Sequence, residues 1–199
     1  AMRWKKTFGK SDISFMAASL VDNDYAYRAT GVGDTGRMQV SRLEPRFEMA
    51  GLAFNYARGN FLMRGEVAYK TPKAFNDASL QIVEKDIVDS SFGFTYSMGA
   101  SNTVGLELVN RRVLGWTDQI QGVRRDTHSL VLNTTVFFMN ELLSINSLTI
   151  YSEPYSSFQQ SFRTSYDWSD SVTLGLDVHL IDVPDRGSGL WRFRDQDQV

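Results

Sequence analysis

The stretch that decides the fold is residues 157–184, which read SFQQSFRTSYDWSDSVTLGLDVHLIDVP. Large apolar side chains alternate with small or polar ones in both of its arms, as in Phe158, Phe162 and Tyr166 and again in Leu174 and Leu176. Successive side chains of a β-strand point to opposite faces. The pattern therefore predicts a β-hairpin with a polar turn at residues 167–170. One face would be apolar, and the other would carry Arg, Asp and His.

The composition limits the classes of protein that fit. The chain has 199 residues, enough for one medium-sized domain, and its net charge of -2 gives no indication of a nucleic-acid partner. It contains no cysteine, so disulfides, thiol chemistry and cysteine-based metal sites are excluded, and the sequence predicts no metal and no cofactor. No run approaches the ~18 apolar residues of a transmembrane helix. The first residues also lack the apolar core of a signal peptide.

The same alternation recurs along the chain and predicts ten strands. We expect them at residues 3–8, 12–21, 46–57, 61–70, 88–98, 103–114, 127–139, 142–151, 157–168 and 172–181. Tight turns at 9–11, 58–60, 99–102, 140–141 and 167–170 alternate with longer polar connections at 22–45, 71–87 and 115–126. A shorter connection at 152–156 precedes the last hairpin. No sustained helical period is present.

This alternation of short and long connections favours an all-β, antiparallel transmembrane β-barrel. Strands of about nine to eleven residues span a bilayer, and only a closed sheet satisfies its backbone polar groups there. Outer-membrane barrels combine short periplasmic turns, long outer loops, an apolar outer band and a polar lumen. Aromatic residues also gather near the predicted strand ends, where amphipathic rings favour the membrane interface. These are Tyr56, Phe61, Tyr69, Tyr96, Trp116, Tyr151, Tyr166 and Trp168.

The predicted topology bears on how much of a barrel the sequence contains. If the tight turns face the periplasm, the strand at 3–8 descends from the outside, and residues 191–199 begin another descending strand. We therefore expect residues 1–199 to be a single partial barrel domain, truncated at both ends, from a barrel of at least about twelve strands.

Three segments carry a resemblance to a known family. These are RWKKTFGKSDISFMAA, FNYARGNFLMRGEVAYK and LWRFRDQDQV. They resemble the C-terminal part of a proteobacterial outer-membrane β-barrel family of unknown function, whose members are often encoded beside RND-type exporters. The resemblance implies a location in the bacterial outer membrane, contact with its lipid, a role in export or uptake, and an RND-type export system as a partner. It supplies no catalytic residues.

The candidate functional residues are the charged and ionisable side chains on the predicted polar faces. We expect them to line the lumen and to set the electric field that a solute meets. They are Arg64, Glu66, Lys70, Glu107, Arg111, Arg163, Asp167, Asp177 and His179. The sequence predicts a non-enzymatic barrel that passively transports or exports a small solute. The alternatives are a structural or exporter-docking barrel without a pore, a soluble ligand-binding barrel of lipocalin type, and a barrel lipase or protease.

Three further motifs point to ordinary structural roles. Residues 31–36 match G-x-G-x-x-G, but they lie in a polar connection with no helical pattern after them, which indicates a loop rather than a dinucleotide site. Asp22, Asp24 and Asp34 do not have the spacing of an EF-hand and are expected to be loop carboxylates. His179 has no G-x-S-x-G element beside it, so a lumen-wall position is favoured over catalysis.

Overall fold

A computed structural model describes residues 1–32, 36–99 and 101–193. In these residues the chain is all-β apart from one short 3-10 helix, η1 (Gly189–Phe193). The strands are β1 (Met2–Phe8), β2 (Ser11–Val21), β3 (Ala26–Val32), β4 (Met38–Leu43), β5 (Arg46–Arg58), β6 (Phe61–Asn76), β7 (Ile82–Met98), β8 (Asn102–Leu114), β9 (Asp126–Phe138), β10 (Leu143–Glu153), β11 (Ser157–Ser169) and β12 (Val172–Asp182). Within this part of the chain, no helix is long and apolar enough to cross a membrane.

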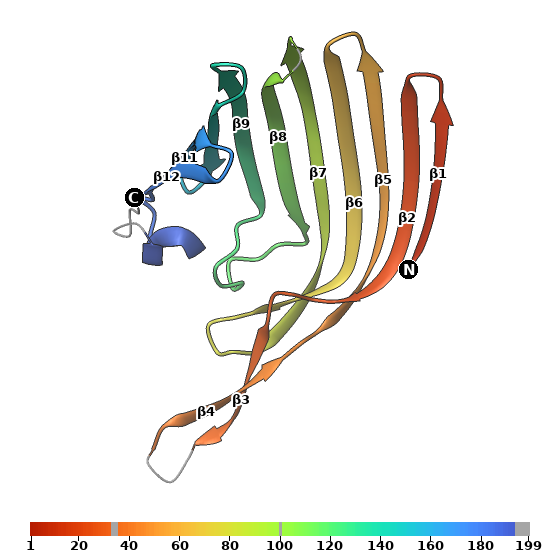
Figure 1. The fold of residues 1–199 in the computed structure, drawn as a ribbon. Coiled ribbons are helices and arrows are strands. Elements are labelled where there is room, and N and C mark those ends of the chain that lie inside the picture. Colours follow the sequence, from red (N-terminus) through yellow and green to blue (C-terminus); the bar gives the residue numbers. More distant parts are fainter. Residues whose placement is uncertain (33–35, 100, 194–199) are drawn as a thin grey trace.

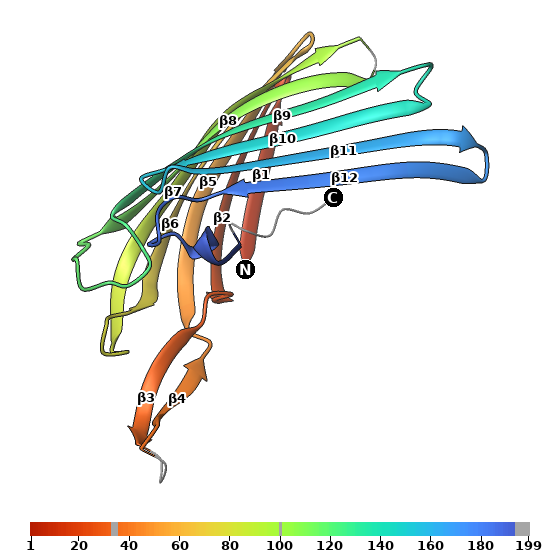
Figure 2. The same ribbon diagram turned by 90° about the vertical axis from the view of Figure 1, so that its left-hand side faces the viewer.

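Ten of these strands form one antiparallel sheet in the order β1-β2-β5-β6-β7-β8-β9-β10-β11-β12. The ten predicted strands are confirmed, with boundaries shifted by a few residues at most positions. In the described residues β1 and β12 pair on one side only, so the sheet is open. The two views in Figures 1 and 2 show it curving into a trough, with the tight turns at one end and the longer connections at the other.

Neighbouring hairpins are staggered in one direction. A single row of cross-strand partners runs from Lys6 through Phe54, Phe92, Leu130 and Phe158 to Asp182. In each strand we count the residues between the member of this row and the tight-turn end. The separation is two residues in β1, four in β5, six in β7, eight in β9 and eleven in β11. A steady stagger of about one residue per strand is the shear that lets a tilted sheet close into a barrel.

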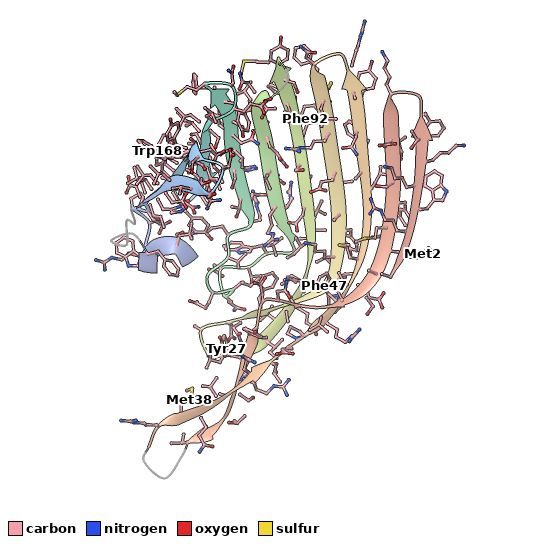
Figure 3. All side chains as sticks on the ribbon, viewed as in Figure 1. Met2, Tyr27, Met38, Phe47, Phe92 and Trp168 are labelled. Atoms are coloured by element: carbon pink, nitrogen blue, oxygen red, sulfur yellow. The ribbon has the colours of Figure 1, made fainter. Side chains whose placement is uncertain are left out.

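Two predicted loops contain more strand than the sequence indicated. Residues 22–45 hold the separate hairpin β3–β4, which projects from the long-connection end and carries Tyr27 and Met38 (Figure 3). The predicted connection 71–87 is largely the continuation of β6 and β7. A β-bulge between Lys70 and Lys73 interrupts the ladder there and shifts the alternation by one residue, which hid this continuation.

Other local predictions were wrong. The turn expected at 167–170 lies at Asp170 and Ser171, because a bulge between Asp167 and Ser169 extends β11. The two-residue turn expected at 140–141 spans Met139 to Leu142, and positive φ angles at Met139, Asn140 and Glu141 account for its tightness. The descending strand expected to begin at residues 191–199 is not formed at 191–193, which belong to η1, and residues 194–199 lie outside the described residues.

The apolar face of the ten-stranded sheet is largely uncovered. Large side chains on this face are exposed in every central strand, among them Leu52, Phe92, Leu108, Leu132 and Phe162. Figure 3 labels Phe92 on the central strand β7, toward its tight-turn end. Among the described residues only six hydrophobic side chains are buried, namely Ala26, Phe47, Ile87, Val113, Ile120 and Val183. The strands therefore do not enclose an apolar core between two layers.

Candidate functional site: the concave polar face

The polar face of the sheet is its concave side. A cavity of about 750 Å³ is lined by polar-face residues of seven adjacent strands, from Arg3 on β1 and Met16 on β2 to Lys70 on β6, Asp89 on β7 and Ser129 on β9. One face of seven neighbouring strands can border a single cavity only if the sheet curves around it. The alternation thus sends large apolar side chains to the convex side and charged or small ones to the concave side.

A compact charged cluster lies at the long-connection end of this cavity. The Arg111 guanidinium donates from Nε to Asp89 Oδ1 at 2.7 Å and from a second nitrogen to Asp89 Oδ2 at 3.1 Å. The Lys70 ammonium donates to the same carboxylate at 2.6 Å. Two cations thus share one anion. Antiparallel pairing explains the contact, because Asp89 and Arg111 are direct cross-strand partners and Lys70 is the partner of the next residue along that face, Ile87.

A second ion pair crosses a whole strand. Arg64 on β6 and Glu107 on β8 both face Gly93 of β7, and their side chains meet at 3.2 Å. A Cβ added at Gly93 would lie 3.1 Å from the Leu106 carbonyl oxygen and 3.2 Å from the Glu107 Cβ. The absent side chain of Gly93 therefore leaves the space in which Arg64 and Glu107 meet.

Gly93→Val is expected to push Glu107 away from Arg64 and to lower the free energy of unfolding by about 1–3 kcal/mol, the usual cost of overpacking. Chemical denaturation of the variant, followed by tryptophan fluorescence, measures this change. The control is Ser91→Val, which places the same side chain on the same face of β7 at a position that already carries a Cβ. Equal stability of the two variants would contradict the role given to Gly93.

The remaining predicted site residues form a separate group on the last two strands. Arg163 donates to Asp177 at 2.7 Å, and Thr173 donates to Asp167 at 2.7 Å. His179 is the direct partner of Ser161 and borders a smaller cavity with Leu148, Ile150 and Ile181. Strands β9 and β10 lie between this group and the group formed by Arg64, Glu66, Lys70, Glu107 and Arg111.

The connection between β8 and β9 folds inward over the concave face. Ile120, only 4% exposed, packs against Ile87 and Val113 of that face, and Trp116 joins the cluster. The Gln121 N–H donates to the Asn76 carbonyl at 2.8 Å, and the Trp116 indole donates to the Val123 carbonyl at 3.0 Å. Residues 115–126 were predicted as a polar loop with Trp116 at a strand end. They instead form an anchored wall of the cavity, which Gly122 and Val123 border.

The Tyr155 side chain closes the cavity beside this wall. Its hydroxyl lies 3.5 Å from the Gly122 carbonyl oxygen, and the Arg124 guanidinium lies 6.0 Å from its ring centre. Burial raises the pKa of the Tyr155 phenol, and the nearby Arg124 partly opposes that rise. The Tyr155 hydroxyl donates to the Gly122 carbonyl, so this side chain is tied to the inward-folded connection.

Two carboxylates that form ion pairs in the structure, Asp89 and Asp22, were not predicted as site residues. Asp89 stands on the predicted polar face, and its role follows only once the register places it beside Arg111. Asp22 pairs with Lys73, and both side chains are buried. Asp22 and Asp24 were expected to be loop carboxylates, and both lie in the connection after β2. Asp22 is nevertheless buried against Lys73, whereas Asp24 stays exposed and lies 3.2 Å from the same ammonium. Residues 33–35 of the 31–36 motif, Asp34 among them, lie outside the described residues.

The described part of the chain holds no group of three or more His, Asp or Glu side chains that could bind a metal ion. Comparisons with protein-family models, with curated proteins and with solved structures found no match. The resemblance to the proteobacterial outer-membrane family therefore stays a prediction.

Proposed function

We propose that this chain is part of an outer-membrane β-barrel whose concave face lines a water-filled lumen and passes a small solute. The observation that carries the proposal is the distribution of side chains on one staggered sheet. Exposed apolar residues occupy the convex face, and ion-paired polar residues occupy the concave face. A lipid-facing surface and an aqueous lumen have these compositions.

Energetics favour this arrangement over a soluble barrel. A lipocalin-type barrel places its apolar side chains inside and its charged ones in solvent, whereas Phe92, Leu174 and Leu176 lie on the convex side and are 43%, 53% and 54% exposed. Exposed apolar patches above a few hundred Å² are rare on soluble monomers and mark contact with a partner or a membrane. Contact with lipid would remove all of these exposed apolar side chains from water.

The transport step needs no bond making or breaking. Cations and anions of the concave face, such as Arg64 with Glu107 and Lys70 with Asp89, would hold a local field that a polar solute meets as it passes. The inward-folded residues 115–126 would narrow one mouth. Association with an RND-type exporter stays a prediction from the resemblance alone.

Single-channel conductance of the full-length protein in planar bilayers tests the proposal. We expect ohmic conductance, and we expect Glu107→Gln to shift ion selectivity toward anions, because it leaves Arg64 without its carboxylate partner. Leu108→Gln, at the next residue on the convex face, is the control that should keep wild-type selectivity. A folded, membrane-inserted protein without conductance would favour the barrel that acts as a scaffold or docking partner.

A further inference from the structure

The concave cavity combines an apolar wall with a small excess of positive charge. Its apolar part comes from Met16 on β2, Met49 on β5, Val109 on β8 and Val123 of the inward-folded connection. These side chains lie on the polar face, most of whose other residues are small or polar. An aqueous passage alone does not require four large apolar residues around one cavity, so their gathering points to an apolar ligand.

The charged part of the wall is unbalanced. Its cations are Arg3, Lys70 and Arg111, and its anions are Glu66 and Asp89, which leaves one positive charge in excess. Asp89 accepts hydrogen bonds from both Lys70 and Arg111, so neither cation has a carboxylate to itself. An incoming carboxylate can take one of these donors without leaving Asp89 unpaired. Charge-assisted hydrogen bonds of this kind are the strong ones in proteins.

We infer that this cavity binds a monoanionic amphiphile, a small molecule with an apolar body and one carboxylate, and that this is the class of solute the barrel handles. The inference rests on the proposed function. The volume of about 750 Å³ lies within the usual range of small-molecule pockets, about 300–1,000 Å³. The apolar body would lie against Met16, Met49 and Val109, and the carboxylate would face Lys70 and Arg111.

The test compares three probes of the same shape and different charge on the full-length protein in nanodiscs. Naphthoate, naphthalenemethanol and naphthylmethylammonium are titrated by isothermal calorimetry, with empty nanodiscs as the blank. We expect naphthoate to bind about ten-fold more tightly than the alcohol and the ammonium probe to bind most weakly, given the usual strength of a hydrogen bond to a charged group. Equal affinity for naphthoate and the alcohol would overturn the inference.

Two variants at the cluster should act in opposite directions. Arg111→Gln is expected to weaken naphthoate binding about ten-fold and to leave the alcohol unchanged. Asp89→Asn frees both cations and should strengthen naphthoate binding. Arg163→Gln, on the same concave face but away from the cavity, is the control and should leave all three affinities unchanged.

The outcomes separate the two proposals. A protein that conducts ions but binds none of the probes, or whose naphthoate affinity ignores both Arg111→Gln and Asp89→Asn, overturns the ligand class and leaves the barrel proposal standing. A protein that binds naphthoate as expected in nanodiscs but never conducts ions in planar bilayers supports the ligand class and overturns passage of a solute through the lumen.

Discussion

Leu176→Arg is expected to stop the chain from assembling in a membrane. Leu176 lies near the middle of β12 on the convex face and is 54% exposed, so a side chain there would contact lipid. Arg or Lys on the lipid face at the bilayer midplane costs about 2–4 kcal/mol. This is a large share of the few kcal/mol by which a native fold is stable. Heat-modifiable gel mobility and the folded fraction in liposomes measure the loss.

The matched control is the next residue along β12. Asp177 lies on the concave face, where it accepts a hydrogen bond from Arg163 at 2.7 Å, and both side chains are well exposed. Exposed ion pairs contribute little to stability, so Asp177→Asn should assemble almost as the wild type does. If Asp177→Asn blocked assembly and Leu176→Arg folded normally, the assignment of the two faces would be inverted.

Lys73→Met is expected to destabilise the long-connection end of the sheet by about 3–5 kcal/mol, the usual cost of breaking a buried ion pair from one side. The Lys73 ammonium donates to the buried carboxylate of Asp22, lies 3.2 Å from Asp24 and stacks 5.1 Å from the centre of the Phe47 ring. Asp22 directly follows β2, just before the projecting β3–β4 hairpin, and its N–H donates to the Pro45 carbonyl. The variant leaves that carboxylate buried without its cation.

Urea titration and limited proteolysis of residues 22–45 measure this effect. Arg42→Gln is the control, since the Arg42–Glu44 pair at the end of β4 is exposed and its loss should change little. The double variant Lys73→Met with Asp22→Asn should recover part of the lost stability, because it no longer buries an uncompensated charge. A Lys73→Met protein as stable and as protease-resistant as the Arg42→Gln protein would show that the pair does not anchor the hairpin.

The sequence predicts the ten-stranded ladder well because one face of each strand is made of large apolar side chains. The alternation of apolar and polar residues can be detected in one sequence wherever one face of a strand has a uniform environment, as for Phe92, Phe94 and Tyr96 in β7. It fails where that environment changes. Strands β3 and β4 are exposed on both faces along most of their length, so no apolar periodicity marks them.

Irregular backbone hid other features for a different reason. The bulge between Lys70 and Lys73 moves the residues after it to the opposite face of the sheet. The alternation of apolar and polar residues therefore breaks in the sequence, although the pairing of β6 with β7 continues. The fragment 190–193 has a strand-like pattern but forms η1, since alternation alone does not supply a partner strand.

The candidate site was predicted as a set of residues but not as an arrangement. Placing Arg64, Lys70 and Arg111 on one face follows from periodicity, whereas their partners depend on register, which the hairpin turns fix only locally. The Arg64–Glu107 contact depends on Gly93 of the strand between them. It can therefore be predicted only when the pairing of all three strands is known. The inward position of residues 115–126 depends on the packing of Ile120 against Ile87. These two residues are distant in the sequence, so no local pattern predicts their contact.

Adjacent single cysteines on β7 test most directly whether the convex face contacts lipid and the concave face contacts water. Because residues 1–199 contain no cysteine, Phe92→Cys and Ser91→Cys each add one labelling site to this part of the barrel, on the convex and concave faces respectively. A thiol-reactive fluorophore is attached in turn to each variant of the full-length protein in liposomes. It is then quenched with spin-labelled lipid and, separately, with iodide. We expect quenching by lipid at position 92 and by iodide at position 91. The reverse pattern, or a position 92 shielded from both quenchers, would contradict the assignment of the two faces.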